Sequence, residues 1–237
     1  MATMHQSPFS EFIAGCRAIV PLVIGAIPFG IIFGTLAASS GLSFAATMAM
    51  SAFVFAGSSQ FIAIGLLTTG TALPLIILTT FVVNLRHLLY AVSIVPYVQR
   101  LPQSWKACLG FFLTDEAFMI AIDRYQRSDA SPYKHWYHLG ASLFMYVNWQ
   151  LCTFAGLTVG HLIPNAANWG LDFAMSATFI GMLIPYLKNQ PTVIAVVVAG
   201  VTSLLAHNFP HQMGLMLAAV AGVTAGAIAE KWLNSKS

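Results

Sequence analysis

Charged residues are scarce in this sequence, and their scarcity excludes most soluble folds. Of the 237 residues only 7% are charged, whereas 58% are hydrophobic. Soluble globular domains carry charge on roughly a quarter of their residues, so a soluble fold of this composition would expose mainly apolar surface to water. Lipid is the solvent that removes this conflict. We therefore predict an integral membrane protein.

Other absences exclude further classes of function. The net charge is only +3, whereas nucleic-acid binding needs a clearly basic surface. The three cysteines are scattered in apolar surroundings without metal-ligand or disulfide spacing, so no metal and no cofactor is expected. Ser58 or Ser59 with His87 could act as nucleophile and base, but the sequence lacks a Gly-x-Ser-x-Gly motif. We do not expect an enzyme.

Long apolar runs fill the sequence instead, and a membrane-spanning helix needs about 20 such residues. We predict an all-α fold, a polytopic transmembrane helical bundle of seven or eight spans, forming one transporter domain over residues 1–237. The run over 107–122 is short, about 24 Å at 1.5 Å per residue, and is a candidate for a partial span. The predicted spans are 18–38, 44–67, 73–98, 107–122, 139–160, 171–187, 192–207 and 213–229.

Lysine and arginine indicate the orientation, because they favour the cytoplasmic side of a membrane protein. Eight spans with a cytoplasmic N-terminus place most basic residues inside, and a seven-span arrangement would move one terminus. We expect a multi-pass protein of the bacterial inner membrane with both termini in the cytoplasm. The inside would hold Arg17, Arg124, Arg127, Lys134, Lys188, Lys231 and Lys236, and the outside Arg100 and Lys106.

Two patterns concern helix packing and duplication. Small residues recur at every fourth position over 26–38 and over 214–226, which allows close helix contact within the chain or with a partner subunit. Residues 41–45 resemble residues 170–174, and internal duplication is typical of transporters. The two halves would be parallel if the 107–122 segment crosses the membrane, and inverted if it does not.

Three charged residues inside apolar runs are the strongest functional signal. Each charge at the centre of a spanning helix costs about 2.5–3.5 kcal/mol, so Arg86, Asp115 and Glu116 must be paired or line a wet cavity. The guanidinium could hold a substrate carboxylate through two hydrogen bonds. Alternatively, it forms a structural ion pair with one of the two acids, and both interpretations hold if that pair breaks during transport.

The polar neighbours of these charges extend the candidate site. Tyr90 follows Arg86 by one helical turn, while Asn84 and His87 share an adjacent face of the same helix. Asp115 and Glu116 project about 100° apart around a helix. One can therefore pair with Arg86 while the other carries a proton or meets an ammonium group, unless both are structural partners.

A cluster of small and polar residues interrupts the second apolar run at 55–61. Such clusters occur where a spanning helix is broken, and the unwound backbone can then bind substrate. The alternative is a tight helix crossing in which Gln60 is hydrogen-bonded to the neighbouring helix.

Three motifs in this order resemble the AzlC family: Ala-Gly-Ser-Ser-Gln-Phe at 56–61, Leu-Arg-His-Leu-Leu-Tyr at 85–90 and Leu-Thr-Asp-Glu-Ala-Phe at 113–118. The Leu-Asp-Phe-Ala sequence at 171–174 also resembles it. The family comprises large subunits of branched-chain amino acid exporters. The resemblance implies gradient-driven export of valine, leucine, isoleucine or methionine. It also implies a small, separately encoded membrane partner of the AzlD type.

These observations together predict a secondary active exporter, coupled to protons, with a polar cavity inside the bundle. A membrane channel and a non-transporting scaffold subunit are the alternatives. The predicted substrate-binding residues are Ser58, Ser59, Gln60, Asn84, Arg86 and Tyr90. The residues predicted to couple protons or form ion pairs are His87, Asp115 and Glu116.

Overall fold

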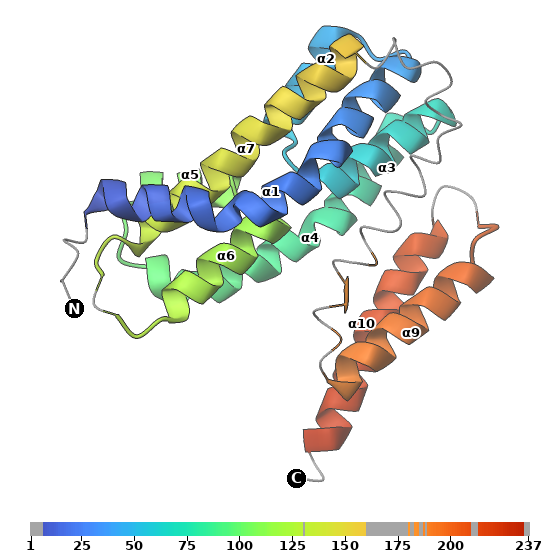
Figure 1. The fold of residues 1–237 in the computed structure, drawn as a ribbon. Helices are drawn as coiled ribbons and strands as arrows, with labels where there is room; N and C mark the ends of the chain where they lie inside the picture. Colours follow the sequence, from blue (N-terminus) through green and yellow to red (C-terminus); the bar gives the residue numbers. More distant parts are fainter. Residues whose placement is uncertain are drawn as a thin grey trace. The chain divides into compact units, whose positions relative to one another are not determined.

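The computed structural model describes residues 7–129, 131–159, 180, 183–184, 187, 189–209 and 213–234, and these residues form helices and no strand. The predicted all-α class is confirmed for this part of the chain. Two compact units are present, one of Met1–Thr68 and Val83–Ala166, the other of Thr69–Val82 and Ala167–Ser237. Figure 1 labels the helices α1 (Pro8–Ser39), α2 (Phe44–Phe53), α3 (Gly57–Thr68), α4 (Leu73–Val98), α5 (Gln103–Phe111), α6 (Asp115–Gln126), α7 (Lys134–Val159), α9 (Gln190–Leu205) and α10 (Met213–Asn234).

In the second unit, α9 and α10 pack through small residues. A methyl group added at Gly222 or Gly226 of α10 would lie within 2.9 Å of Ala195 on α9. The small-residue stripe over 214–226 therefore serves helix packing within the chain. The second copy of the expected repeat, at 170–174, lies outside the described residues, as does most of the predicted span over 171–187.

In the first unit, α1 and α7 run in the same direction and pack closely. Gly15 of α1 faces the main chain of Tyr137 at the start of α7, and Gly34 faces that of Thr153 near its end. The residue numbers rise together on both helices, so the pair is parallel. A methyl group on either glycine would overlap a carbonyl oxygen of α7, which explains the small-residue stripe over 26–38.

We expect Gly140→Ala to force α1 and α7 apart and to lower the midpoint of thermal unfolding by several degrees. The added methyl group would overlap the main-chain carbonyl of Phe12, and overpacking of this kind costs about 1–3 kcal/mol. Gly25→Ala on α1 is the control, because nothing lies within 4 Å of the methyl group it adds. Equal unfolding midpoints for the two variants would contradict this account of the packing.

Helix α2 runs along α7 in the opposite direction and stops halfway. The ring of Phe44, at the start of α2, lies 5.9 Å from that of Phe154 near the end of α7. The carbonyl of Ala52, near the end of α2, accepts a hydrogen bond of 3.2 Å from the hydroxyl of Tyr146 in the middle of α7. Helix α2 therefore enters the unit from the end where α7 finishes.

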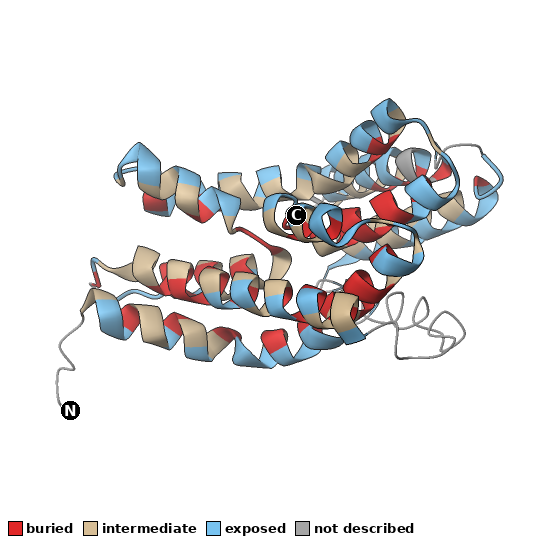
Figure 2. Cartoon of the chain, turned by 90° about the horizontal axis from the view of Figure 1, so that it is seen from above, coloured by how far each residue is buried: buried red, intermediate tan, exposed pale blue. Residues whose placement is uncertain are grey.

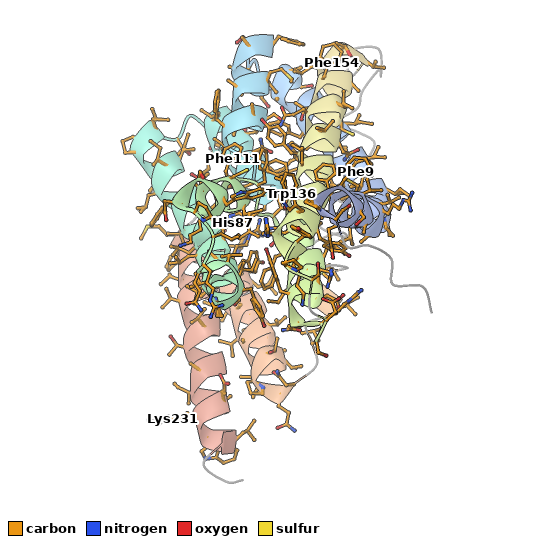
Figure 3. The ribbon with its side chains drawn as sticks, turned by 90° about the vertical axis from the view of Figure 1, so that its left-hand side faces the viewer. Phe9, His87, Phe111, Trp136, Phe154 and Lys231 are labelled. Carbon is orange, nitrogen blue, oxygen red and sulfur yellow. The ribbon has the colours of Figure 1, made fainter. Side chains whose placement is uncertain are left out.

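Helix α5 enters from the opposite end. The ring of Trp105 on α5 lies 4.9 Å from that of Trp136 in the first turn of α7. Phe112, directly after α5, lies 5.0 Å from Tyr146 between ring centroids. Helix α5 therefore runs parallel to α7 and also stops halfway along it. In Figure 3, the labelled Trp136 and Phe154 lie towards opposite ends of α7 and mark the two sides from which α5 and α2 enter.

Helix α6 then returns to the start of α7. The hydroxyl of Tyr125, near the end of α6, lies 3.3 Å from Nδ1 of His138. Tyr97, near the end of α4, stacks on Tyr125 at 5.3 Å between ring centroids, so α4 also points towards the start of α7. Helices α5 and α6 with residues 112–114 at the tip are here named the second hairpin.

Helix α3 must likewise turn back from the end of α2. Ser58, at the start of α3, is hydrogen-bonded to Arg86, which lies about 20 Å along α4 from its first residue at 1.5 Å per residue. Helix α3 continues for about 15 Å beyond Ser58 before residues 69–72 link it to α4. If α3 pointed towards the start of α7, this link would cover about 35 Å, whereas its five Cα–Cα steps extend at most about 18 Å. Helices α2 and α3 with residues 54–56 are named the first hairpin.

The two hairpins follow one plan in opposite directions. Each has a three-residue tip, and each second arm, α3 or α6, has 12 residues. Helix α1 precedes the first hairpin, and α4, which runs in the opposite direction to α1, precedes the second. The described residues therefore contain an inverted duplication, α1–α2–α3 and α4–α5–α6. The duplication expected between 41–45 and 170–174 is a different one.

The apolar runs over 44–67 and 107–122 are each broken at a hairpin tip. The break considered for the cluster at 55–61 is confirmed at residues 54–56, and the short run over 107–122 is divided between α5 and α6. The second break lies where the sequence starts a new helix inside an apolar run. The Thr114 hydroxyl accepts a hydrogen bond of 3.3 Å from the amide of Ala117, and acidic residues occupy the first turn of α6. Both features stabilise a helix N-terminus.

Helices α1 and α4 are, by length and composition, long and apolar enough to cross a membrane. Their outward surfaces are apolar: Ile24 of α1 is 63% exposed and Leu88 of α4 is 60% exposed. Figure 2 shows buried and exposed positions alternating along the long helices. Exposed apolar side chains in such number suit contact with lipid.

Candidate functional site

Arg86 of α4 joins the two hairpins near their tips. Its Nη2 donates a hydrogen bond of 2.5 Å to the hydroxyl of Ser58, the second residue of α3. The same nitrogen lies 3.1 Å from Oδ2 of Asp115, the first residue of α6. The side chains of Arg86 and Asp115 are 26% and 14% exposed. The guanidinium of Arg86 therefore bridges the first turns of α3 and α6, the second arms of the two hairpins.

Tyr90 holds the other oxygen of the same carboxylate. Its hydroxyl donates a hydrogen bond of 2.5 Å to Oδ1 of Asp115, and its ring stacks on Phe118 at 4.5 Å between centroids. His87, labelled in Figure 3, packs edge-on against the Tyr90 ring at 5.9 Å. The sequence left open which acid pairs with Arg86, and the structure assigns Asp115. The pair and both of its neighbours had been selected from the sequence.

Glu116 lies beside this pair without joining it. It is half-buried in the first turn of α6, and within the described part of the chain it forms no ion pair. The two adjacent acids therefore occupy different environments, as their angular separation on a helix requires. Asp115 is held by Arg86 and Tyr90, whereas Glu116 interacts with Thr114 of its own helix start.

The first turns of α3 and α6 make this region favourable for anions. A helix N-terminus carries the equivalent of roughly half a positive charge, and its free amide groups donate hydrogen bonds to anions. The guanidinium of Arg86 lies at both N-termini through Ser58 and Asp115. The site is therefore arranged for negative charge, and in this structure the Asp115 carboxylate occupies it.

Ser59 and Gln60 bond to the backbone of their own hairpin. The Ser59 hydroxyl donates to the carbonyl of Ala56 at 2.9 Å, and Nε2 of Gln60 donates to the carbonyl of Met50 at 3.0 Å. Both side chains are fully buried. Gln60 therefore bonds to α2 of its own hairpin, and a role for either residue towards substrate stays a prediction.

Helix α7 supplies two further donors to the end of α2. Gln150 donates to the carbonyl of Ser51 at 3.0 Å, and Tyr146 donates to that of Ala52 at 3.2 Å. These two side chains satisfy carbonyl groups that a helix C-terminus leaves without backbone partners, whereas the Met50 carbonyl that Gln60 contacts also accepts from the amide of Val54. The sequence analysis missed both α7 residues, because a single Gln or Tyr in an apolar run does not show which backbone it meets.

Trp149 lies against the start of α3. A methyl group added at Gly57 would come within 3.0 Å of the indole ring of Trp149. The ring of Phe33 on α1 stacks on Trp149 at 6.1 Å between centroids. Trp149 is only 7% exposed. Its position in the middle of an apolar run, away from the interface where Trp is usually found, was the available sequence signal.

Several buried polar atoms near the hairpins have no hydrogen-bond partner in the described structure. Arg86 Nε and Trp149 Nε1 are donors, whereas Gln60 Oε1 and Asn84 Oδ1 are acceptors. An unsatisfied buried group costs about 1–3 kcal/mol, so such atoms in one region point to a ligand or to water. Both donors and acceptors are present, as a zwitterion requires.

A second ionic cluster connects the last turn of α6, the second arm of the second hairpin, to α1. Arg124, in the last turn of α6, donates through Nε to Glu11 of α1 at 3.0 Å and through Nη1 to Asp129 at 2.7 Å. Ser131 donates to Glu11 at 2.8 Å, and Lys134 lies 3.3 Å from Asp129. Arg124 is 6% exposed, so this basic residue, expected on the cytoplasmic side, is buried in an ionic cluster.

Asp129 lies in the loop between α6 and α7. Its hydrogen bond with Arg124 lowers the pKa of its carboxyl group, and Lys134 lowers it further. A lowered pKa in the folded state means that this carboxylate stabilises the fold above its unfolded pKa. The contribution is lost as the pH falls through the folded value.

The class of protein follows from these features. Long helices with exposed apolar surfaces, two re-entrant hairpins and an ion pair between their tips are typical of a polytopic membrane protein with an internal polar site. The family described as AzlC protein matches residues 21–163, a stretch that contains both hairpins and α4. The chain belongs to the AzlC family.

Three relatives illustrate the range of the similarity. The inner membrane protein YgaZ of Escherichia coli is 28% identical over 236 residues, covering 95% of this chain and 92% of that protein. An uncharacterized membrane protein of Archaeoglobus fulgidus is 32% identical, covering 92% and 96%. The branched-chain amino acid transport protein AzlC of Bacillus subtilis is 30% identical, covering 76% and 71%. No solved structure matches this chain.

Proposed function

We propose that this chain exports zwitterionic amino acids with apolar side chains across the bacterial inner membrane. Valine, leucine, isoleucine and methionine are the proposed substrates, and similarity to the branched-chain amino acid transport protein of Bacillus subtilis supports the first three. The chain acts as one transporter domain over residues 1–237. It is the large subunit of a two-component system with a small membrane partner of the AzlD type.

The observation that carries the proposal is the ion pair between the two hairpin tips. The substrate carboxylate takes the place of Asp115 on Arg86 and Ser58, and the substrate ammonium group then binds the released Asp115 carboxylate. The exchange adds one positive and one negative group to a balanced pair. No net charge is therefore buried, and the large cost of an unpaired buried charge is avoided.

The remaining predicted residues complete the site. Arg86 Nε and Trp149 Nε1 offer donors to the substrate carboxylate, and Asn84 Oδ1 and Gln60 Oε1 offer acceptors to its ammonium group. Tyr90 keeps Asp115 oriented during the exchange. Ser59 holds the unwound backbone at the first tip.

The opposite entry of the hairpins supports access to the site from each side of the membrane in turn. With the N-terminus in the cytoplasm, the first hairpin borders the outer side of the site and the second borders the cytoplasmic side. Opening one hairpin at a time gives alternating access. Glu116, with His87 nearby, carries the proton that couples the movement to the gradient.

The test is efflux of labelled valine and methionine from proteoliposomes that contain this chain with and without the small partner. Saturable efflux that depends on an imposed pH gradient and on both chains is the expected result. Flux that never saturates would indicate a channel instead. No flux of either amino acid, with both proteins folded and present, would overturn the proposed function.

Glu116→Gln should abolish the dependence of efflux on the pH gradient while leaving exchange of labelled for unlabelled amino acid intact. The amide cannot carry a proton, but it still fills the same volume, and exchange needs no net proton movement. Asp123→Asn is the control, because the Asp123 side chain is 64% exposed and pairs only with Arg127. A Glu116→Gln variant whose efflux still follows the pH gradient would exclude Glu116 as the proton carrier.

A further inference from the structure

Tyr146 of α7 contacts the tips of both hairpins. The centroid of its ring lies 5.0 Å from that of Phe55 in the first tip and 5.0 Å from that of Phe112 in the second. Phe111, labelled in Figure 3 at the end of α5, adds a third contact at 6.1 Å. Edge-to-face contacts of this kind are each worth a fraction of a kilocalorie to about 1.5 kcal/mol beyond simple burial.

The hydroxyl group of the same residue distinguishes the two tips. It donates to the carbonyl of Ala52 at 3.2 Å, which is one of the groups that the end of α2 leaves unsatisfied. Among the described residues, Tyr146 meets the second hairpin through ring contacts with Phe111 and Phe112. Ring contacts allow sliding that a directional hydrogen bond to the backbone resists, so the first tip is held more firmly than the second.

A second connection between the hairpins is the polar one through α4. Arg86 binds Ser58 of the first hairpin and Asp115 of the second. Under the proposed function, the substrate takes the place of Asp115 on Arg86, and this connection opens each time substrate binds. Tyr146 is then the described contact that still joins the two tips.

We infer that Tyr146 is a positioning residue that couples the movements of the two hairpins, and the inference rests on the proposed function. Tyr146 packs against aromatic rings and a backbone carbonyl, so it acts through the hairpins and not on the substrate. Loss of the Tyr146 side chain slows the conformational step of transport. It leaves substrate affinity almost unchanged.

The first experiment compares Tyr146→Ala, Tyr146→Phe and Phe154→Ala in proteoliposomes with the partner subunit. Tyr146→Ala should lower the maximal rate of net efflux on the order of tenfold, with the KM changed less than about twofold, because losing the hydrogen bond and ring contacts removes roughly 1.5 kcal/mol from the coupling. Tyr146→Phe keeps the ring contacts and should show a smaller loss. Phe154→Ala is the control, an aromatic residue of the same helix whose ring packs on Phe44 near the start of α2, away from the two tips.

A second experiment measures the coupling without any substrate. Spin labels are attached at Leu67→Cys on α3 and Met119→Cys on α6, both exposed, after replacing the native cysteines, and the distance distribution between them is recorded by electron spin resonance. In an Arg86→Ala background, where the polar connection is already open, a narrow distribution that broadens on adding Tyr146→Ala is expected. The background substitutions are Cys16→Ala, Cys108→Ala and Cys152→Ala.

The outcomes separate this inference from the proposed function. An unmodified protein that transports neither amino acid contradicts the proposed function, while the spin-label distances still decide on the coupling. If Tyr146→Ala keeps its maximal rate, or changes only the KM, Tyr146 does not couple the hairpins. An unchanged distance distribution in that variant overturns the inference as well.

Discussion

Arg86→Ala is expected to reduce efflux on the order of 100-fold while the protein still assembles with its partner. The variant loses the charge-assisted hydrogen bonds to the substrate carboxylate, which are worth about 1.5–3 kcal/mol, and it leaves the Asp115 carboxylate without its cation. Arg86→Lys keeps the charge but loses the planar fork that binds a carboxylate through two nitrogens. It should retain weak transport with a raised KM.

Two comparisons make this prediction specific. Arg127→Ala removes an arginine whose side chain is 59% exposed and whose ion pair with Asp123 lies at the surface, and exposed pairs contribute little. It should transport like the unmodified protein. Arg86→Ala combined with Asp115→Ala removes both charges and should recover stability without transport. An Arg86→Ala variant that assembles and exports at the normal rate would contradict the proposed exchange on Arg86.

Part of this site could be predicted from the sequence because charge inside an apolar run is costly wherever the helices lie. That cost alone selects Arg86, Asp115 and Glu116 and requires a partner for the cation. Helical spacing then adds Tyr90 to the same face as Arg86. The structure brings Arg86, Asp115 and Tyr90 together, whereas it directs Ser59 and Gln60 to the hairpin backbone.

The hairpins could not be predicted from hydropathy, because a crossing helix and two half-helices can have the same apolar composition. One local signal was available in the Thr-Asp-Glu sequence at 114–116. A hydroxyl followed by acidic residues is typical of a helix start, and a start inside an apolar run implies a break before it. Which way the chain turns after the break depends on contacts such as Ser58 with Arg86 and Trp105 with Trp136, far apart in sequence.

The partner of Arg124 is a second feature that the sequence alone could not predict. Glu11 lies 113 positions away along the sequence, and both residues stand near the ends of apolar runs, where exposure is the usual expectation for a charged side chain. The parallel packing of α1 and α7 places the start of α1 beside the end of α6. Only that packing turns two apparently exposed charges into a buried pair.

Arg124→Ala should therefore destabilise the protein more than any single surface substitution. Removing one member of a buried ion pair leaves the other without compensation, at a cost of about 3–5 kcal/mol, and Glu11 is 6% exposed. For a chain of this size, such a loss lowers the midpoint of thermal unfolding by roughly 6–20 °C. The measurement is thermal unfolding of the purified protein in detergent, with Arg127→Ala as the exposed control.

The double variant Glu11→Gln with Arg124→Met tests whether Arg124→Ala loses stability because Glu11 is left unpaired or because the ion pair itself is needed. It removes both charges and keeps their volumes, so it should recover much of the lost stability, because well-packed neutral side chains often replace a buried pair without loss. Arg124→Ala should also weaken the loss of stability on acidification, since the pKa of Asp129 is lowered mainly by Arg124. If Arg124→Ala unfolds at the same temperature as Arg127→Ala, the cluster does not anchor the second hairpin to α1.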